Sequence, residues 1–230
     1  MSKLFRKNRK NSLTKGKAVN YLKYAIGEIT LVVLGILIAL YINDRNSKRI
    51  EKNTAISVYI NIKRQINTDM NTISNDIKEN NKLFKNYEYG ALLIELNDRT
   101  KIDTLVKIEH ELLQYTDGDV SSNIYQNLIN SGESKLLKNK TIMEKIQKLE
   151  ATYMNMNRME QIHSNSIQNN FALDIKKNIK IVDLSARNPD AIFGIDFQNN
   201  FALTHYLCVE KDKAYAQAIK EIELLIELID

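Results

Sequence analysis

The chain has 230 residues, of which 43% are hydrophobic and 27% charged, and it contains seven glycines and one proline. So few turn-forming residues, with few alternating strand-like runs, favour an all-α fold built from long helices. The single cysteine, Cys208, excludes an intramolecular disulfide and a thiolate metal cluster, and we expect it to be a small buried apolar residue.

The net charge of +5 is concentrated at the N-terminus. Residues 1–23 contain no Asp or Glu and eight basic residues: Lys3, Arg6, Lys7, Arg9, Lys10, Lys15, Lys17 and Lys23. The remaining chain has 25 basic and 28 acidic side chains, so its net charge is −3. This distribution argues against nucleic acid as a partner. We predict that residues 1–23 form a basic cytoplasmic arm that contacts the lipid bilayer.

Residues 24–43 are predicted to form a transmembrane helix. From residue 25 to 42 the segment is apolar apart from Glu28, Thr30 and Tyr41, and as a helix it covers about 27 Å, close to the thickness of a hydrocarbon core. A buried helix of a soluble protein would normally have a polar face. No small-x-small cleavage site follows the segment, so an uncleaved anchor is expected rather than a secretion signal.

The basic residues also predict the orientation of this helix. Eight precede it, whereas the four that follow closely are diluted by Asp44 and Glu51. Because positive charge is retained on the cytoplasmic side, the N-terminus is expected in the cytoplasm. Residues 44–230 then form an extracytoplasmic domain, which is periplasmic if the helix lies in a bacterial inner membrane.

Within the predicted membrane helix, Glu28, Gly35 and Ala39 share one face at helical spacing. Gly35 and Ala39 form a small-xxx-small pair, which lets two helix backbones approach closely. We therefore name these three residues as candidates for helix packing, in a homo-oligomer or against an envelope protein. The alternative is that Gly and Ala are simply common in membrane helices and that Glu28 marks the interface, where Lys23 can meet it.

Beyond the membrane we expect one long helix, stacked directly on the spanning segment. Lys63 and Asn80 occupy its two polar seam positions, and the apolar positions are Ile56, Tyr59, Ile66, Met70, Ile73, Ile77, Phe84 and Tyr87. The fold class is thus all-α, with one N-terminal transmembrane helix that continues into a long-helix bundle or a coiled-coil-like extracytoplasmic domain.

Shorter helices are expected over residues 92–96 and 102–115, and a third should end at Gly132. A capping box of Thr141 and Glu144 predicts another long helix, with Ile142, Ile146, Leu149, Tyr153, Met156 and Met159 on its apolar face. A final amphipathic helix contains Phe201, Tyr206, Ala214, Ile219, Ile222, Leu225 and Ile229. The segment around Pro189 is the least helical part and the best candidate for a contact loop.

No catalytic, cofactor or metal site is predicted. His110, His163 and His205 occur singly, without a partner at zinc spacing. Glu109 and Glu111 are expected on solvated helix faces. The residues Asp117, Asp119, Ser121 and Asn123 alternate as in a calcium loop, but Ser122 and Leu128 replace its required Gly and Glu, so a turn capped by Asp119 or Ser121 is expected instead. Phosphate-binding and nucleophile-elbow motifs are absent.

The stretch "YLKYAIGEITLVVLGILIALYINDRN" resembles the hallmark of a family of bacterial single-pass membrane proteins of unknown function, "YAIGEI-LVV-GILIAL-IN-WN". A weaker resemblance lies in "YQNLINSGESKLLKN", through Tyr125, Leu128, Ser131, Gly132 and Asn139. Arg45 stands where the family has a tryptophan. The resemblance implies a membrane location and places Gly27 and Glu28 in a recurring pattern, but it implies no activity.

The function that the sequence favours is a non-enzymatic, membrane-anchored helical protein, an interaction or scaffold module of the cell envelope. The alternative is a periplasmic ligand-sensing domain on a single-pass anchor, although residues 1–23 are too few to form a transducing domain. A third class, a soluble protein whose basic arm binds nucleic acid, predicts recovery from the cytosol.

Overall fold

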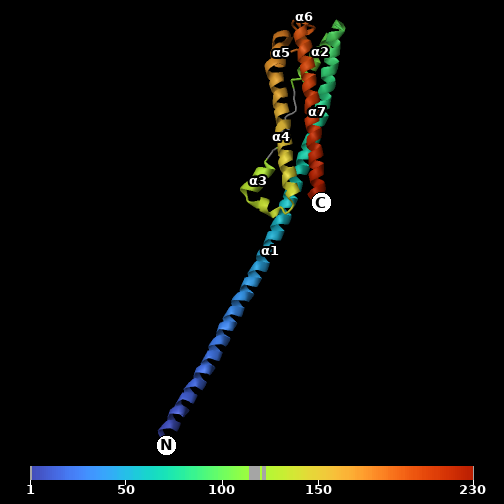
Figure 1. Ribbon diagram of the computed structural model, residues 1–230. Coiled ribbons are helices and arrows are strands. Elements are labelled where there is room, and N and C mark those ends of the chain that lie inside the picture. The colour runs from blue at the N-terminus through green and yellow to red at the C-terminus, as the bar shows by residue number, and fades with distance from the viewer. Residues whose placement is uncertain (1, 114–119, 121–122, 230) are drawn as a thin grey trace. The chain divides into compact units, whose positions relative to one another are not determined.

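The computed structural model describes residues 2–113, 120 and 123–229, with side chains described from residue 22 onward. The chain divides into two compact parts, Met1–Thr54 and Ala55–Asp230. The prediction of an all-α fold is confirmed, since the described strands are only two residues long each (Figure 1). The predicted domain boundary at residues 43 and 44 lies inside the first helix and stays a prediction.

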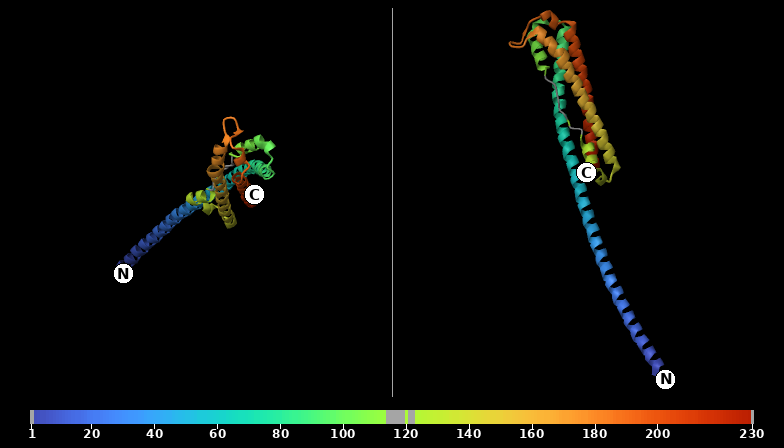
Figure 2. Two further views of the ribbon diagram at one scale, coloured as in Figure 1. Left: turned by 90° about the horizontal axis from the view of Figure 1, so that it is seen from above. Right: turned by 90° about the vertical axis from the view of Figure 1, so that its left-hand side faces the viewer.

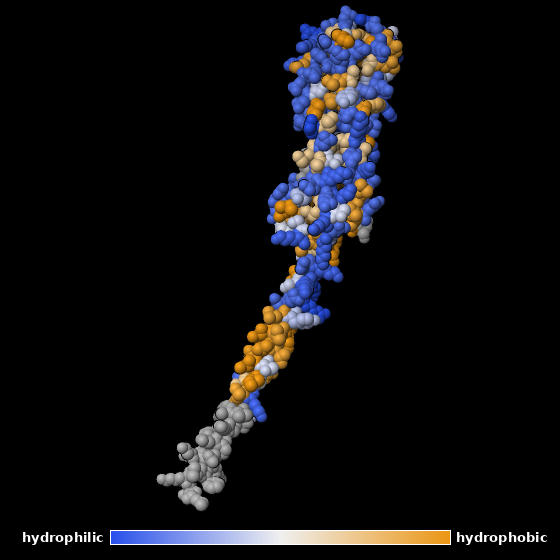
Figure 3. Space-filling view, in the orientation of Figure 1, coloured by the Kyte–Doolittle hydropathy of each residue, from blue (hydrophilic) through white to orange (hydrophobic). Residues whose placement is uncertain are grey.

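The first part is formed by the N-terminal portion of α1 (Ser2–Glu95). Every side chain from Leu22 to Asn53 is exposed, and this stretch includes a segment that is long and apolar enough to cross a membrane. Figure 3 shows the segment as a nearly continuous apolar band on the face that is drawn. None of its apolar window is buried against the described residues, which is compatible with a membrane anchor.

The second part is a bundle in which the C-terminal portion of α1 lies beside α4 (Lys140–Ser166) and α7 (Ile195–Ile229) (Figures 1 and 2). α4 and α7 pair along much of their length. The shorter helices are α2 (Ile102–Glu111), α3 (Ile124–Asn130), α5 (Ala172–Asn178) and α6 (Pro189–Ile192), with 3₁₀ turns at Arg99–Lys101 and Glu133–Leu136. A π-helical turn, Ile167–Phe171, joins α4 to α5.

Some predicted helix ends are confirmed and others are wrong. Gly132 follows α3 with φ of +74°, the left-handed conformation expected of a helix stop. The cap of α4 is Asn139, whose side chain accepts a hydrogen bond from the Thr141 amide, so Thr141 is not the capping residue. α1 continues to Glu95, so the separate short helix predicted over residues 92–96 is instead the end of α1. α2 ends at Glu111, before the predicted end at residue 115.

Within the part of the chain that the structure describes, the segment around Pro189 is the least helical, as predicted. It contains an antiparallel hairpin of β1 (Ile179–Lys180) and β2 (Ser185–Ala186). Pro189 then opens α6, in the first turn where its missing N–H costs no hydrogen bond.

Two apolar clusters form the core of the bundle. One contains Ile66 and Ile73 of α1, Ile146 and Tyr153 of α4, and Ala218 and Ile222 of α7. The other contains Tyr87 of α1, Leu105 of α2, and Phe171, Phe197 and Phe201. Tyr87, Phe171 and Phe201 meet edge to face, with ring centroids 5.2 to 6.3 Å apart. Both clusters contain residues of α1 and α7, so these two helices pack against the rest of the bundle at two places along their length.

The predicted apolar faces are mostly right but are displaced in places. Ile56 is 48% exposed, because the bundle contact of α1 begins with Val58. Met159 is only half-buried, and the neighbouring Glu160 takes the buried position. Tyr206 is 58% exposed on α7, beside the buried Leu207.

Candidate functional site

The candidate packing residues of the membrane segment lie on an uncovered helix surface. Glu28, Gly35 and Ala39 are all exposed, and a Cβ added at Gly35 would meet nothing within 4 Å. The Thr30 hydroxyl donates to the Ile26 carbonyl over 2.8 Å, which satisfies it inside the helix. The role of these residues stays a prediction. Lys23 is exposed, and the side chains of the other seven basic residues of the arm, like the predicted turn at Asp119 and Ser121, lie outside the described residues.

A layer of buried polar side chains lies between the two apolar clusters. We call it the polar layer and define it as Asn80 of α1, Glu160 and His163 of α4, and Lys211 of α7. On α1 and α7 these residues lie between the buried residues of the two clusters, and on α4 they follow Met156 of the first cluster and precede Phe171 of the second, in the π-helical turn. All four are at most 4% exposed, so a molecule in solvent does not reach them in this conformation.

A chain of contacts crosses the polar layer from α7 to α1. Lys211 Nζ lies 3.2 Å from His163 Nδ1, and His163 Nε2 lies 3.5 Å from the Tyr87 hydroxyl. The hydroxyl in turn donates to the Leu112 carbonyl over 3.5 Å. With Lys211 protonated, its ammonium group can only donate, which assigns Nδ1 as the acceptor and the ring proton to Nε2. The contacts then run in one direction, from Lys211 through His163 and Tyr87 to a backbone oxygen.

Two tyrosine–carboxylate pairs extend this network. The Tyr215 hydroxyl donates to Glu160 Oε1 over 2.6 Å, and Lys211 Nζ lies 5.8 Å from the centre of the Tyr215 ring. In the apolar cluster that contains Ile66 and Ile146, the Tyr153 hydroxyl donates to Asp69 over 3.0 Å and joins α4 to α1. Tyrosine suits these places because its ring fills the core while its hydroxyl satisfies a buried acid.

Asn80 ties α1 to α7 directly. Its amide nitrogen donates to the Cys208 carbonyl over 2.9 Å and to Asp212 Oδ1 over 2.7 Å. Asn80 was predicted at a seam position, and its complete burial confirms this. Cys208, also fully buried, matches the prediction of a small core residue, and burial raises the pKa of its thiol to about 12.

Burial determines the charge states within the polar layer. It lowers the pKa of His163 to about 3, with the nearby Lys211 acting in the same direction, so the imidazole is neutral at pH 7. Burial also lowers the pKa of Lys211, while Cys208, Glu160, Asp76 and Asp212 act in the opposite direction. The layer is therefore an enclosed set of hydrogen bonds and charges that joins α1, α4 and α7.

Glu109 contradicts the prediction of a solvated carboxylate. It is fully buried in α2, and neither of its oxygens has a hydrogen-bond partner among the described residues. Burial, reinforced by the charge of Asp174, raises its pKa to about 9, so the buried form at pH 7 is the neutral acid. Glu111, two residues on, is exposed as predicted.

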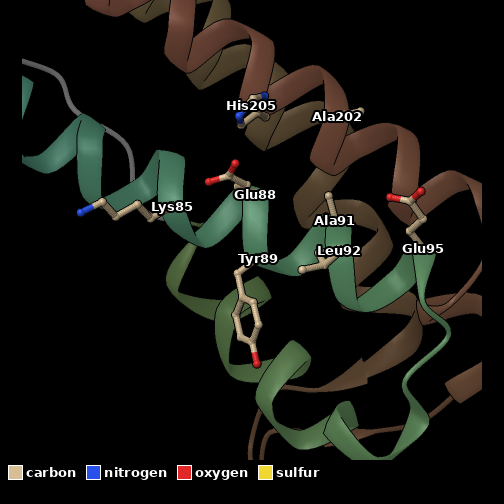
Figure 4. A pocket seen from close by; sticks show the side chains of 8 residues that line it. All are labelled: Lys85, Glu88, Tyr89, Ala91, Leu92, Glu95, Ala202 and His205. Carbon is tan, nitrogen blue, oxygen red and sulfur yellow. The ribbon is translucent and has the colours of Figure 1, made fainter.

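An open groove of about 550 Å³ lies between α1 and α7, away from the polar layer. Lys85, Glu88, Tyr89, Ala91, Leu92 and Glu95 come from α1, and Ala202 and His205 from α7. Figure 4 shows Glu88 directed from α1 toward His205. The His205 ring stacks on Phe84 at 4.3 Å, and its Nε2 has no hydrogen-bond partner among the described residues. The groove is thus lined by apolar and charged side chains, and the Nε2 of one lining residue, His205, is buried beneath its surface.

Gly90 sets the spacing of the two helices beside this groove. A Cβ at Gly90 would lie 2.3 Å from the nearest atom of the Phe201 ring, and Phe201 is fully buried. Only glycine lets the ring pack against the α1 backbone here.

The groove and the polar layer were not predicted from the sequence, although a signal for the polar layer is present. Cys208, Lys211, Tyr215, Ala218 and Ile222 follow one another at intervals of three and four residues, so Lys211 lies within an apolar stripe. Glu160 and His163 interrupt the stripe of α4 in the same way. His205 gives no comparable signal, because its place in the groove depends on the pairing of α7 with α1.

No group of three or more metal-ligating side chains that could hold an ion is found among the described residues. No protein-family model, curated protein or solved structure matches the chain. Function is therefore inferred from the chain's own residues.

Proposed function

We propose that the protein is a non-enzymatic interaction or scaffold module of the bacterial cell envelope, anchored by one helix in the inner membrane. Its N-terminal arm is cytoplasmic, and residues 44–230 are periplasmic. The observation that carries the anchor is the apolar segment of α1, which none of the residues described by the structure covers. The basic arm and the resemblance to single-pass membrane proteins support the location and the orientation.

The partner surface we assign is the groove between α1 and α7 together with its apolar rim. Tyr89 and Leu92 lie on α1, Leu96 directly follows its last residue, and Leu203 and Tyr206 lie on α7. All five are between 43% and 66% exposed. Two helices with exposed apolar residues beside a shared groove match the surface that an amphipathic helix occupies. The occupant proposed is such a helix of an envelope protein.

Site-specific photo-crosslinking from native membranes tests this assignment. A photo-reactive residue at Leu92 is expected to capture a defined envelope protein. The matched control is Met154 of α4, which is 65% exposed and lies outside the groove. If both positions capture the same proteins, or neither captures any, the groove is not the partner surface.

A second candidate function, ligand sensing, is favoured by the groove of about 550 Å³, which is lined by His205 and by the charged residues Lys85 and Glu88. A volume of this order suits a small molecule. Thermal unfolding of the full chain against a metabolite panel separates the two functions, because a ligand bound to the folded state raises the melting temperature. The sensor predicts a His205-dependent rise for some compound, whereas the scaffold predicts none.

A further inference from the structure

The hairpin of β1 and β2 presents apolar side chains to solvent at its tip. Val182 is fully exposed and Ile181 is 52% exposed. Figure 2 shows the hairpin projecting beyond the helices of the bundle. Two neighbouring β-branched aliphatic residues at a projecting tip are unfavourable in water, unless another surface covers them.

The shape of this tip is fixed by its own contacts. Leu184 packs against the apolar cluster with φ of +49°, a conformation that a leucine adopts only under constraint. The Asp183 carboxylate accepts hydrogen bonds from the amide and the hydroxyl of Ser185, over 3.1 and 2.6 Å. The exposure of Ile181 and Val182 therefore follows from an ordered turn, and strain of this kind is concentrated at functional sites.

Basic side chains lie on the hairpin and at its base. Lys176, Lys177, Lys180 and Arg187 are all exposed. With Leu173 and Asn188, three of them line an open groove of about 750 Å³ next to the hairpin. The acidic residues of this segment are Asp174, which accepts a hydrogen bond from Asn200 over 2.6 Å, and Asp183, which faces Ser185. The segment 173–188 thus carries a local positive charge, although the chain after residue 23 is acidic overall.

We propose that the hairpin tip docks on an anionic phospholipid surface, with Ile181 and Val182 in the boundary between headgroups and acyl chains and with the four basic residues against lipid phosphates. Charge complementarity carries this choice. The convex form of the tip supports it, because a fluid lipid layer closes around projecting side chains, whereas a folded protein partner must offer a matching pocket. This contact is separate from the membrane helix and from the groove between α1 and α7.

The absence of tryptophan from the chain allows a direct test. Val182→Trp places a single tryptophan, which can be excited selectively beside the tyrosines, at the tip of the full chain, held in neutral phosphatidylcholine nanodiscs. Adding vesicles that contain phosphatidylglycerol and brominated acyl chains is expected to shift the emission to the blue and to quench it by at least twofold. Neutral brominated vesicles are expected to leave the emission unchanged, and high salt should reverse the effect.

Matched variants separate the tip from the basic N-terminal arm, which can itself attract anionic vesicles. Met154→Trp reports from an exposed position on α4, and its emission should not change. In the Val182→Trp chain, Lys176→Glu with Lys177→Glu should weaken vesicle binding about tenfold, whereas Lys138→Glu with Lys140→Glu, also exposed, should leave it unchanged. Water-exposed emission from position 182 with anionic vesicles, or an equal shift with neutral ones, overturns the proposal.

Discussion

Glu109 is a single carboxyl group whose burial has a consequence for the stability of the whole bundle. Its pKa in the folded chain is about 9, against 4.5 in the unfolded chain. Between these values the unfolded state releases a proton that the folded state keeps. The free energy of unfolding is therefore highest, as far as Glu109 is concerned, below about pH 4.5, and it falls progressively as the pH rises toward 9.

Glu109→Gln is expected to remove this dependence, because the amide has nearly the same shape and does not ionise. Wild type and variant should have similar stability at pH 5, and at pH 8 the variant should be more stable by on the order of 4 kcal/mol. Thermal unfolding followed by circular dichroism measures the difference. Glu111→Gln, at an exposed position, is the control, and its stability relative to wild type should not change between pH 5 and pH 8.

Gly90 is a second position with a consequence for stability, because a single added Cβ atom would meet the ring of Phe201. Gly90→Ala would push a methyl group into the ring of Phe201, which is too deeply buried to move away freely. A loss of about 1–3 kcal/mol in the free energy of unfolding is expected. The smaller side chain of Phe201→Leu should make the alanine less costly, so that the double variant loses less than the sum of the single losses. Additive losses would show that the close contact with the ring is not the cause.

At the level of helices, the polar layer lets each long helix meet its neighbours in one register. Sliding α7 by one turn against α4 would move Lys211 away from His163 and leave buried polar groups unpaired, at a cost of about 1–3 kcal/mol or more for each. The apolar stripes alone, which repeat every three or four residues, would tolerate such a shift. We infer that the layer contributes register specificity, as polar residues in helix seams do.

Asn80→Leu tests this at the junction of α1 and α7. The change keeps the side-chain volume but leaves the Cys208 carbonyl and Asp212 without the Asn80 donor. A loss of about 1–3 kcal/mol is expected, which corresponds to roughly 2–12 °C in melting temperature for a domain of this size. Asn81→Leu is the matched control, since Asn81 is exposed and bonds only its own helix. Equal losses in both variants would contradict a role for the junction.

The predicted helices and the observed ones agree where helical spacing and turn residues carry the information. Gly132 ends a helix as expected, and the apolar face of α4 is found from Ile142 to Met156. The displaced positions have a common cause. Spacing within one helix identifies a stripe but not the neighbour that covers it, so neither the exposure of Ile56 nor the burial of Glu109 could be derived from local pattern.

For the whole molecule, the location is determined by the free-energy cost of exposing an uncovered apolar helix to water. The full chain is expected to stay with the membrane pellet after carbonate extraction. A reporter that is active only outside the cytoplasm should work when fused after residue 230 and fail when fused before residue 1.

A variant in which the seven basic residues before Lys23 are neutral should lose this fixed orientation, because the charge difference across the helix disappears. Unchanged orientation would assign the topology to another feature.

The face of Gly35 and Ala39 offers a test of association in the membrane. Because a Cβ at Gly35 meets nothing within 4 Å in the single chain, Gly35→Leu with Ala39→Leu is not expected to disturb an isolated helix. If two helices pack closely at this face, the added side chains separate them, and the crosslinked fraction in native membranes should fall severalfold. Val33→Leu with Leu37→Phe enlarges side chains at the same spacing on the opposite face and should leave the fraction unchanged. Equal crosslinking in all three chains would leave Gly35 and Ala39 as ordinary lipid-facing residues.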